Sequence, residues 1–589
     1  GFREADLVLE DSFRTPMVHQ AYLEPHGVIA DVSATGKVTV WSPTQSVFMA
    51  QGRIADAFGL PLTKVRVIVT CLGGGFGGKV ETLVEPIAVA LAQKTRGPVK
   101  LILTREEEFI AAKPRHPAVV DFKVGARKDG TLAAIEARLV YDTGAFADDG
   151  PMVASVGTFY ASQPYRIPHV KIDGYAVYTN HALCGAFRGF GNPQQAYAFE
   201  SMMDMIAEKL GIDPLELRLK NALEGGDSLV IGQVVNSVGL KECLSKSARG
   251  IGWKSDKPRE NRGQGLASLW HTSANLFTQA VVKMQQDGTL VLSTGASDIG
   301  QGSDTVLCQI VAETMGLPLE DVAVSTPDTD TSPYNWATVA SRTTYVVGNA
   351  ARLAAIDVKA KIFELAAEEL DAAPHLLEIE DRHVIVPGPS GRRISLQEIA
   401  TKAHWRKGGP IMGVASFGME GPGFDPEVCK LTGAVLRRRG GFVFGSHAVE
   451  VEVDPATGQV TVLKIAAAHD VGRAVNPMGV EGQIQGGFAM GLGYALYEEI
   501  RYQDGRVLNP SFLDYRIPTM LDVPDIEAII VEEADEGGPF GAKGVGEPGL
   551  VGVAPAVANA IYNAVGVRIR ELPITAEKLY WALKEKRGK

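Results

Sequence analysis

Cysteine is scarce in this sequence of 589 residues. The five cysteines lie far apart in the chain, and no two of them have CxxC spacing: Cys71, Cys184, Cys243, Cys308 and Cys429. Zinc sites, iron–sulfur clusters and disulfide frameworks have recognisable cysteine spacings, so this scatter argues against all three within the chain. If the protein carries out redox chemistry, we expect its iron–sulfur relay on another chain.

Long apolar runs and an excess of positive charge are also missing. No stretch of 18 uninterrupted apolar residues occurs, and the first residues, GFREADLVLEDSF, lack the basic-then-apolar pattern of a secretion signal. The formal net charge of -11 argues against general nucleic-acid binding, which needs a basic surface. We therefore predict a cytoplasmic protein with neither a membrane span nor a nucleic-acid partner.

Hairpin patterns recur along the chain, and helical patterns alternate with them. Gly-containing turns between alternating apolar residues predict five hairpins, at 31–41, 122–141, 280–293, 449–465 and 500–508. The segment 193–211 predicts a helix that ends at Gly211. A helix over 351–371 is predicted from an apolar stripe of Leu353, Ile356, Ala360, Phe363, Ala367 and Leu370. Together these patterns predict an α+β fold with mixed sheets and helices packed on them.

The length of the chain exceeds what one hydrophobic core usually serves, so at least two domains are expected. The charged segment GWKSDKPRENRGQG (252–265) has no periodicity and is the best candidate linker. We predict a first domain over 1–250, a linker over 251–265 and a second domain over 266–589. The Gly- and Pro-rich segment 408–433 is interpreted as a surface or pocket-covering loop rather than a strand.

The segment LGGGFGGK (72–79) satisfies two familiar phosphate-binding patterns, GxGxxG and GxxxxGK. A P-loop needs Ser or Thr after the lysine, and here Val80 follows. A dinucleotide site needs an acidic residue about 20 positions further on. Glu106 to Glu108 come too late for that role and have the pattern of a helix start. The more general prediction is a backbone that approaches an anionic or polar ligand closely, with amides facing it.

Five glycine-bearing segments are spread over the chain, and three of them pair Gly with Gln, a combination that suits a large polar ligand between two domains. They are LGGGFGGK (72–79), CGAFRGFGNPQQ (184–195), DIGQGSD (298–304), VEGQIQGGFAMGLG (480–493) and AKGVGEPG (542–549). In this order and at roughly these separations, they resemble the large molybdenum-binding subunit of the xanthine dehydrogenase and aldehyde oxidase family of molybdenum hydroxylases. The resemblance implies two elongated mixed-sheet domains with molybdopterin held between them, the second domain carrying a catalytic glutamate.

The resemblance also implies roles for individual residues. Glu547 of GVGEP is implied to be the catalytic base, because a carboxylate among glycines can approach a metal-bound hydroxyl closely. Gln45 of SPTQS matches the glutamine above the metal, and the loop with Gly75, Phe76 and Gly77 is implied to lie beside it. The implied pterin-holding set is Arg188, Ile299, Gly300, Gln301, Gly302, Ser341, Thr343, Gln483, Lys543, Val545 and Gly546.

The implied cofactor is molybdenum with molybdopterin and a terminal sulfido ligand. Whether the pterin carries a cytosine nucleotide is left open. No protein side chain is expected to ligate the metal, because the pterin and inorganic ligands do so. The implied partners are a [2Fe-2S] subunit and an FAD-containing flavoprotein. A further domain usually begins the family's large subunits, so it is either supplied by a separate chain or has been removed.

The substrate pocket departs from the purine-oxidising members of the family. Their glutamate and arginine fall on Val80 and near Val156, so xanthine is disfavoured. Glu81 follows Val80 directly, but it is one position away from the place of the family's glutamate, and a shift of one position redirects a side chain on a helix or strand. Phe190 matches a ring-stacking phenylalanine, which favours an aromatic substrate. Gly185 replaces the metal-bridging cysteine of the carbon monoxide dehydrogenases, which argues against CO oxidation.

The preferred hypothesis is therefore a molybdenum hydroxylase subunit that adds oxygen from water to an aromatic N-heterocycle or aldehyde. One alternative is a reductive enzyme similar to 4-hydroxybenzoyl-CoA reductase, which a strong low-potential electron donor would reveal. An alternative of another class is a non-catalytic nucleotide-binding protein, which tight binding of NAD or ATP would reveal. Substrate, direction of reaction, electron acceptor and oligomeric state stay open.

Overall fold

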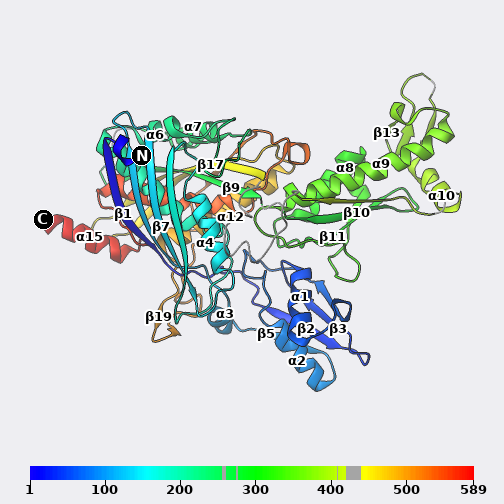
Figure 1. The fold of residues 1–589 in the computed structure, drawn as a ribbon, viewed down its shortest axis with the longest axis horizontal. Coiled ribbons are helices and arrows are strands. Elements are labelled where there is room, and N and C mark those ends of the chain that lie inside the picture. Colours follow the sequence, from blue (N-terminus) through cyan, green and yellow to red (C-terminus); the bar gives the residue numbers. More distant parts are fainter. Residues whose placement is uncertain (255–259, 274–275, 390, 407–408, 419–439, 589) are drawn as a thin grey trace.

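The computed structural model describes residues 1–254, 260–273, 276–389, 391–406, 409–418 and 440–588. These residues form three parts that surround a common centre (Figure 1). We call residues 27–102 the lobe, residues 278–417 the arm and the remainder the body. In Figure 1 the lobe lies below the body and the arm extends to the right.

Two four-stranded mixed sheets enclose the main core of the body. One sheet has the order β1-β6-β7-β8 and the other β21-β18-β17-β9, each with one parallel pair, β7 with β8 and β18 with β21. Helix α5 packs on β1 and β6, α14 packs on β9 and β17, and the two helices pack against each other. The bounds are β1 (Leu7–Thr15), α3 (Arg105–Ala111), β6 (Ala118–Ala126), β7 (Leu132–Gly144), α4 (Gly150–Tyr160), β8 (His169–Tyr178), α5 (Asn192–Leu210), α6 (Pro214–Asn221), α7 (Leu240–Ile251), β9 (Arg262–Ser273), β17 (Gly440–Val453), β18 (Val460–Asp470), α12 (Pro477–Leu496), β19 (Tyr502–Gln503), β20 (Arg506–Val507), β21 (Ile526–Val531), α13 (Pro548–Val551), α14 (Val553–Val565) and α15 (Ala576–Gly588).

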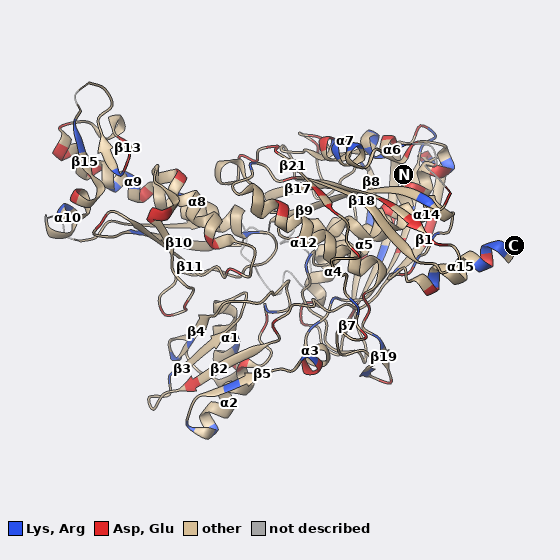
Figure 2. Cartoon of the chain, turned by 180° about the vertical axis from the view of Figure 1, so that it is seen from behind, with Lys and Arg blue, Asp and Glu red and all other residues tan. Residues whose placement is uncertain are grey.

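Helices α13 and α14 form the apolar centre of the body. Their stretch Pro548–Val565 is long and apolar enough to cross a membrane by composition, and 78% of it is buried inside the fold. Gly263 and Gly265 on β9 let α14 lie directly on the strand, because a Cβ at either position would lie 2.2 to 2.3 Å from backbone oxygens of α14. Figure 2 shows charged residues mostly at the periphery, while α12 in the centre is nearly free of them.

The lobe is a small α/β unit with its own core. Its sheet has the order β4-β3-β2-β5, in which β3 and β4 are parallel and the other pairs antiparallel. Valines from the strands and alanines from α1 and α2 fill the core. The bounds are β2 (Gly27–Val32), β3 (Val38–Ser42), α1 (Val47–Phe58), β4 (Val65–Val69), α2 (Glu85–Thr95) and β5 (Val99–Ile102).

The arm packs two long helices on a four-stranded sheet of order β12-β11-β10-β16, and a three-stranded sheet lies at its tip. It has a separate hydrophobic core. The bounds are β10 (Thr278–Met284), β11 (Leu290–Thr294), α8 (Ser303–Met315), β12 (Val322–Val324), α9 (Gly348–Leu370), β13 (Glu378–Glu380), β14 (His383–Ile385), β15 (Arg393–Ser395), α10 (Leu396–Arg406) and β16 (Met412–Phe417). The interpretation of 408–433 as a loop rather than a strand is wrong for Met412–Phe417, which form β16. Residues 408 and 419–433 of that segment lie outside the described residues.

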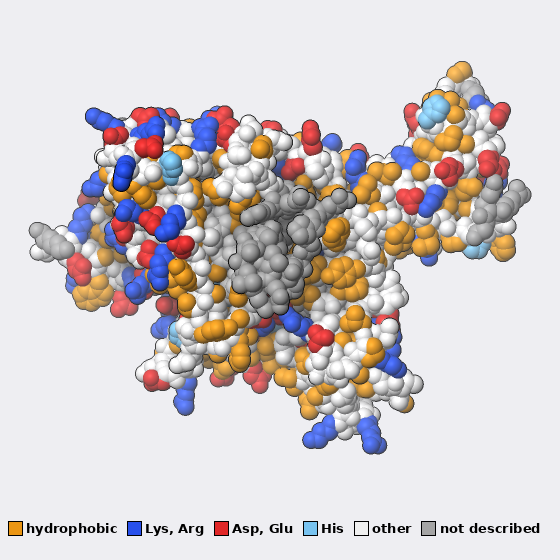
Figure 3. Space-filling view, in the orientation of Figure 1, with side chains coloured by type: hydrophobic (Ala, Val, Ile, Leu, Met, Phe, Trp, Pro, Cys, Tyr) orange, Lys and Arg blue, Asp and Glu red, His pale blue; other side chains and the backbone are white. Residues whose placement is uncertain are grey.

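Helix α9 confirms the helix predicted over 351–371, but only part of the predicted apolar stripe faces the core: Leu370 is buried, and Phe363 and Ala367 pack against the core of the arm. Leu353 and Ile356 are 39% and 42% exposed, whereas Ala354 and Val358 are fully buried. A Cβ on Gly413 of β16 would lie 2.1 Å from the carbonyl oxygen of Ala354, so strand and helix are in very close contact. Only the face with small residues allows this approach, and larger apolar side chains are left on the surface of the arm (Figure 3).

The other local predictions agree with the structure. All five predicted hairpins form antiparallel pairs: β2–β3, β6–β7, β10–β11, β17–β18 and β19–β20. The helix that ends at Gly211 is α5, and Gly211 has a φ of +68°. Mixed sheets with packed helices confirm the α+β class.

The hydrophobic cores do not follow the predicted division at 251–265. The main core of the body joins residues from both predicted domains, from Phe13 and Phe199 to Phe488 and Leu583. Lobe and arm instead have cores of their own, one within each predicted domain. Sequence periodicity does not show this, because it reports which face of an element is buried and not against which part of the chain.

Candidate functional site

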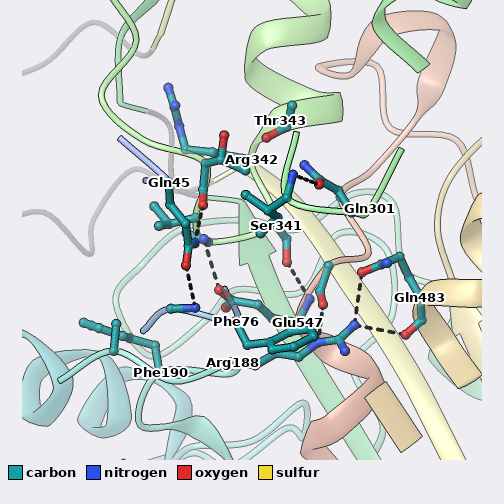
Figure 4. A pocket seen from close by; sticks show the side chains of 18 of the residues that line it. Gln45, Phe76, Arg188, Phe190, Gln301, Ser341, Arg342, Thr343, Gln483 and Glu547 are labelled. Carbon is teal, nitrogen blue, oxygen red and sulfur yellow. Dashed lines mark hydrogen bonds between the residues drawn. The ribbon is translucent and has the colours of Figure 1, made fainter. Parts of the chain in front are cut away.

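A cavity of about 1440 Å³ lies where body, lobe and arm meet. Its volume exceeds the usual 300 to 1,000 Å³ of a pocket for one small ligand, so it can hold a cofactor and a substrate together. Figure 4 shows labelled side chains from all three parts converging on it. The predicted site residues that line it are Gln45, Phe76, Gly77, Val80, Val156, Arg188, Phe190, Ile299, Gly300, Gln301, Ser341, Thr343, Gln483, Lys543, Val545, Gly546 and Glu547. Gly75 and Gly302 are not among the lining residues, although both are next to residues that are.

Gln45 connects the lobe to the arm at the edge of the cavity. Its amide nitrogen donates to the carbonyl oxygen of Thr338, 2.9 Å away, and its Oε1 accepts from the backbone N–H of Gly77, also 2.9 Å away. The Gly77 N–H, predicted to face the cofactor, is therefore used inside the protein. One hydrogen of the Gln45 amide nitrogen is left for a partner in the cavity, since an amide group has two.

The glycine-rich loop 73–79 is held from behind by buried charges. The Lys79 ammonium is buried and pairs with Glu24 at 2.6 Å. Behind it, the Glu108 carboxylate accepts from the backbone N–H of His26, and Nδ1 of the same histidine lies 2.8 Å from it. Nε2 of His26 lies 3.1 Å from the carbonyl oxygen of Gly78, which ties this cluster to the loop. Burial raises the pKa of Glu108, but its buried partners lower it more, to well below its usual range.

Arg188 braces three segments of the cavity wall. Its Nε donates to the carbonyl oxygen of Gly546 at 2.6 Å, and its Nη2 donates to the carbonyl and side-chain oxygens of Gln483 at 3.0 and 3.1 Å (Figure 4). Its backbone N–H donates to the carbonyl oxygen of Phe76. Burial lowers the pKa of Arg188 to about 10, which leaves it charged at neutral pH.

Glu547 lies at the N-terminus of α13, where Pro548 begins the helix. Its backbone N–H donates to Oγ of Ser341, and its Oε1 accepts from the backbone N–H of Ala340 at 3.1 Å. Its Oε2 lies 2.6 Å from Nε2 of His271. Burial raises the pKa of Glu547, but His271, the Ala340 amide and Arg188 together bring it below its usual value. The carboxylate is therefore ionised at neutral pH.

The GQG loop of the arm presents its backbone differently. Gln301 is folded back onto its own loop, accepting from the N–H of Ile299 and donating to Oγ of Ser303. Gly300 and Gly302 have φ values of +102° and +77°, and a Cβ on either would meet nothing within 4 Å. Gly302 is the N-cap of α8. The first turns of α8 and α12 both line the cavity, and helix N-termini attract anions such as phosphate.

Lys543 contributes to the cavity through its backbone. Its ammonium is fully buried, 2.6 Å from Oδ2 of Asp470 and 3.3 Å from the carbonyl oxygen of Ser237. A pterin can therefore contact the backbone of Lys543. It cannot contact the ammonium group, because that charge is buried and paired with Asp470 within the body.

Several residues of the cavity wall have a strained backbone. Phe76, Phe190, Ala340 and Ser341 line the cavity with φ values between +41° and +52°, a region that side-chain-bearing residues rarely adopt. Such strain persists only where the surrounding structure imposes it, and it concentrates at functional sites. Gly189 and Gly191, on either side of Phe190, also have positive φ. Because glycine adopts this conformation without strain, the turn around Phe190 is less strained than it would be with other residues there.

The part of the cavity predicted to take the substrate contains more charge than the sequence predicts. Val80, Val156 and Phe190 line the cavity, and so do Glu81 and Arg53, whose side chains pair at 3.2 Å. Glu81 lines the same cavity as Val80, because residues 76–84 form turns and bends in which side chains do not alternate as in a strand.

Asp149 adds a further carboxyl group to this part of the cavity. Burial, together with Asp148 and Glu81, raises the pKa of Asp149 to about 7. It precedes α4 directly, and the sequence patterns above do not single it out. An aspartate before a helix is usually a cap, so no sequence pattern marks this one as a pocket residue.

The lining fits a large, flat, hydrogen-bonding group. Gly300 and Gly486 both line the cavity, and the space where a Cβ would project is open at each of them. A Cβ on Gly486 would have Nη1 of Arg188 as its nearest neighbour, at 4.0 Å. Around them are uncharged amides and two helix N-termini. In the described part of the chain, no three His, Cys, Asp or Glu side chains cluster in a way that could hold a metal ion.

Comparisons with known proteins agree with this geometry. Family models of the molybdopterin cofactor-binding domain match residues 1–222 and 245–524. The xanthine dehydrogenase molybdenum-binding subunit of Escherichia coli O157:H7 is 37% identical over 98% of this chain and 77% of its own length. The chain belongs to the xanthine dehydrogenase and aldehyde oxidase family of molybdenum hydroxylases.

Other relatives lead to the same family. A probable xanthine dehydrogenase subunit of Bacillus subtilis (strain 168) is 34% identical over 100% of this chain and 78% of its own length. The crystal structure of quinoline 2-oxidoreductase from Pseudomonas putida 86 superposes with a TM-score of 0.90 at 26% identity, over 99% of this chain and 77% of that chain.

These findings confirm the resemblance carried by the five glycine segments. The chain has the fold of a molybdenum hydroxylase large subunit, is an enzyme, and binds molybdenum with molybdopterin. The alternative of a non-catalytic nucleotide-binding protein is therefore wrong. The roles of single site residues stay predictions.

Proposed function

We propose that this chain is the catalytic subunit of a hydroxylase that adds oxygen from water to an electron-poor carbon of an aromatic N-heterocycle or aldehyde, with Glu547 as the base. The observation that carries this proposal is an ionised, mostly buried carboxylate in a cavity shaped for the cofactor. Oε1 of Glu547 accepts a hydrogen bond from Ala340 and Oε2 is in charge contact with His271, and each oxygen keeps a lone pair that can accept a proton from within the cavity.

The cofactor would be held by backbone groups of Ile299 to Gly302 and Lys543 to Gly546, together with Gln483, and Gln45 would donate its remaining amide hydrogen beside the metal. When bound, the molybdenum cofactor activates water and accepts two electrons from the substrate. The N-termini of α8 and α12 suit its phosphate groups, whether or not it carries the cytosine nucleotide. Mass spectrometry of the released pterin would decide between the two forms.

The electrons would leave to other subunits. We propose a [2Fe-2S] partner and an FAD-containing partner, and a terminal sulfido ligand on the metal. The widely spaced cysteines of this chain support a separate iron–sulfur subunit, and the E. coli relative is itself described as one subunit of an enzyme. A cytoplasmic location belongs to the same proposal.

The substrate would lie between apolar side chains and a charged edge. Phe190 supports ring packing. The Glu81–Arg53 pair brings a carboxylate and a guanidinium to the cavity from positions other than Val80 and Val156. The two valines therefore no longer argue against purines, which belong in the substrate screen beside quinoline-type rings and aldehydes.

Replacing the base tests the proposal. Glu547→Gln should retain molybdenum and fold, and should lower kcat by roughly 10² to 10⁴-fold, because the proton acceptor is lost. Since the pKa of Glu547 is lowered, wild-type kcat should stay level as pH falls from 7 and decline only below the usual range of a glutamate carboxyl. Turnover of the variant within a few-fold of wild type would remove Glu547 from its role.

Replacing Glu81 tests the charged edge. Glu81→Gln should raise KM roughly 10-fold or more for purines, which present ring N–H groups to a carboxylate, because a hydrogen bond to a charged group is lost. Unsubstituted quinoline, which has no ring N–H, should change by about two-fold at most and serves as the control. Equal changes for both substrates would show that Glu81 maintains the shape of the pocket and does not bind the ring edge.

A further inference from the structure

His271 is a buried histidine in direct contact with Glu547. Its side chain is 3% exposed, and its Nε2 lies 2.6 Å from Oε2 of Glu547. Among the described residues, neither of these two atoms has a hydrogen bond of good geometry. The two side chains are therefore in close charge contact, but the N–H bond of Nε2 does not point directly at the carboxylate oxygen. His271 also lines the cavity.

The imidazole of His271 is fixed by its surroundings. It stacks on the ring of Tyr160 from α4, with centroids 5.2 Å apart and an interplanar angle of 14°. The Tyr160 hydroxyl accepts from the backbone N–H of Thr272, which anchors the stack to β9. Nδ1 of His271 is buried with no hydrogen-bond partner in the described part of the chain. A neutral ring therefore carries its proton on Nε2, because the carboxylate oxygen of Glu547 lies 2.6 Å from that nitrogen and, among the described residues, no acceptor lies beside Nδ1.

Other charged groups near Glu547 are already engaged. The Arg188 guanidinium acts on the carboxylate from a distance while it donates to Gly546 and Gln483. Arg115, which is fully buried, is a further distant cation. Arg342, in the loop next to Ala340, donates to a side chain and to backbone carbonyls instead. Among the residues that the structure describes, His271 is thus the titratable side chain in contact with the carboxylate.

We propose that His271 is a positioning residue for Glu547, which keeps the carboxylate ionised and oriented so that it can accept a proton from within the cavity. This rests on the proposed role of Glu547 as the base. Without His271, one oxygen of a buried carboxylate would face no donor. Burial would then raise the pKa of Glu547, since the largest opposing effect comes from this histidine.

The first test uses the pH profile of kcat of the holoenzyme complex. His271→Phe keeps the ring stack on Tyr160 but removes both nitrogens, and His271→Gln keeps an N–H donor. His447→Gln is the matched control, because His447 is equally buried in the same sheet and faces His469 rather than Glu547.

His271→Phe should move the acid limb of the profile upward by about one pH unit or more, so that the loss at pH 7 recovers as the pH is raised. His271→Gln should restore part of the shift, and His447→Gln should leave the limb in place. A limb that does not move in His271→Phe, or a loss of kcat that is equal at every pH, would overturn the proposal, because a purely structural role produces that result.

The second test does not depend on turnover. Thermal unfolding of the full chain, with and without cofactor, is compared for wild type, His271→Phe, Glu547→Gln and the double variant. His271→Phe should lower Tm at pH 7, and it should lower it much less when Glu547 is already Gln, because no charge is then left unpaired. Additive shifts would contradict a direct coupling of the two side chains.

The two proposals fail in different ways. If Glu547→Gln retains turnover while the unfolding cycle shows coupling, the base assignment is wrong and the pair between His271 and Glu547 stands. If Glu547→Gln abolishes turnover while the cycle is additive and the acid limb stays in place, Glu547 keeps its role and His271 loses its own.

Discussion

The GGGFGG loop of the lobe and the GQG loop of the arm are both rich in glycine and both reach the same cavity, yet their glycines serve different needs. Gly77 and Gly300 have nearly the same φ, +103° and +102°. A Cβ on Gly77 would lie 2.7 Å from the carbonyl oxygen of Ala186, whereas a Cβ on Gly300 would meet nothing within 4 Å. In the first loop protein neighbours demand glycine; in the second the demand comes from φ, and the space beside Gly300 is open.

The difference shows that a glycine-rich motif is not by itself a ligand cradle. Gly75 and Gly77 allow the loop to pass between Gln45 and the AFRGFG segment, so they build the wall of the site. Gly300 and Gly486 leave the volume that a large planar group would occupy. Substitutions of equal size at the two loops should therefore separate loss of fold from loss of cofactor.

The largest effect is expected for Gly77→Ala. The new methyl group would press on backbone atoms of Ala186 and Phe187, which cannot move away cheaply, and the positive φ adds about 1 to 3 kcal/mol of strain. We expect a Tm lowered by several degrees and strongly reduced molybdenum content, measured by calorimetry and elemental mass spectrometry. A variant with wild-type Tm would show that the two loops are not in close contact.

Gly75→Ala should have an intermediate effect. Its Cβ would lie 2.6 Å from Oε1 of Gln45, the far end of a side chain that can rotate away. The hydrogen bond that Gln45 accepts from Gly77 and the one that it donates to Thr338 would then be lost, at about 1 kcal/mol each. Turnover should fall more than stability, as measured by kcat beside Tm. Adding Gln45→Ala should cause little further loss if the effect runs through Gln45.

The smallest effect on the fold is expected for Gly300→Ala. The φ of Gly300 makes Ala unfavourable by about 1 to 3 kcal/mol, but no neighbour is displaced. Tm of the cofactor-free chain should fall less than in Gly77→Ala, while molybdenum content should fall out of proportion to Tm. Normal molybdenum loading would mean that the space beside Gly300 is not used by the cofactor.

Much of the fold follows from local sequence. The five hairpins are predictable because each turn needs a residue with positive φ between alternating apolar residues, and Gly36, Gly130, Gly288, Gly458 and Gly505 supply it. The buried face of α9 is not predictable in this way. The helix carries apolar residues on several sides, and close contact with β16 selected the alanine face.

The site shows the same limit. All five glycine segments contribute to the cavity wall, since eleven of its predicted site residues besides Glu547 come from them. Glu81 and His271 carry no pattern of their own. Glu81 lines the cavity because the chain turns irregularly around it. In the sequence His271 looks like any residue of a buried strand, and its contact with Glu547 becomes visible only when β9 and α13 are packed together.

The sequence by itself determined the α+β class, the hairpins and the family, because turn chemistry, periodicity and the order of glycine segments are properties of short stretches of chain. Only the tertiary structure decided that one core joins both halves of the chain, that lobe and arm stand apart with cores of their own, and that Glu547 meets His271. The shared core and the pair of Glu547 with His271 depend on contacts between residues hundreds of positions apart, and the separate cores of lobe and arm depend on which elements pack together, so none of these is a property of a short stretch of chain.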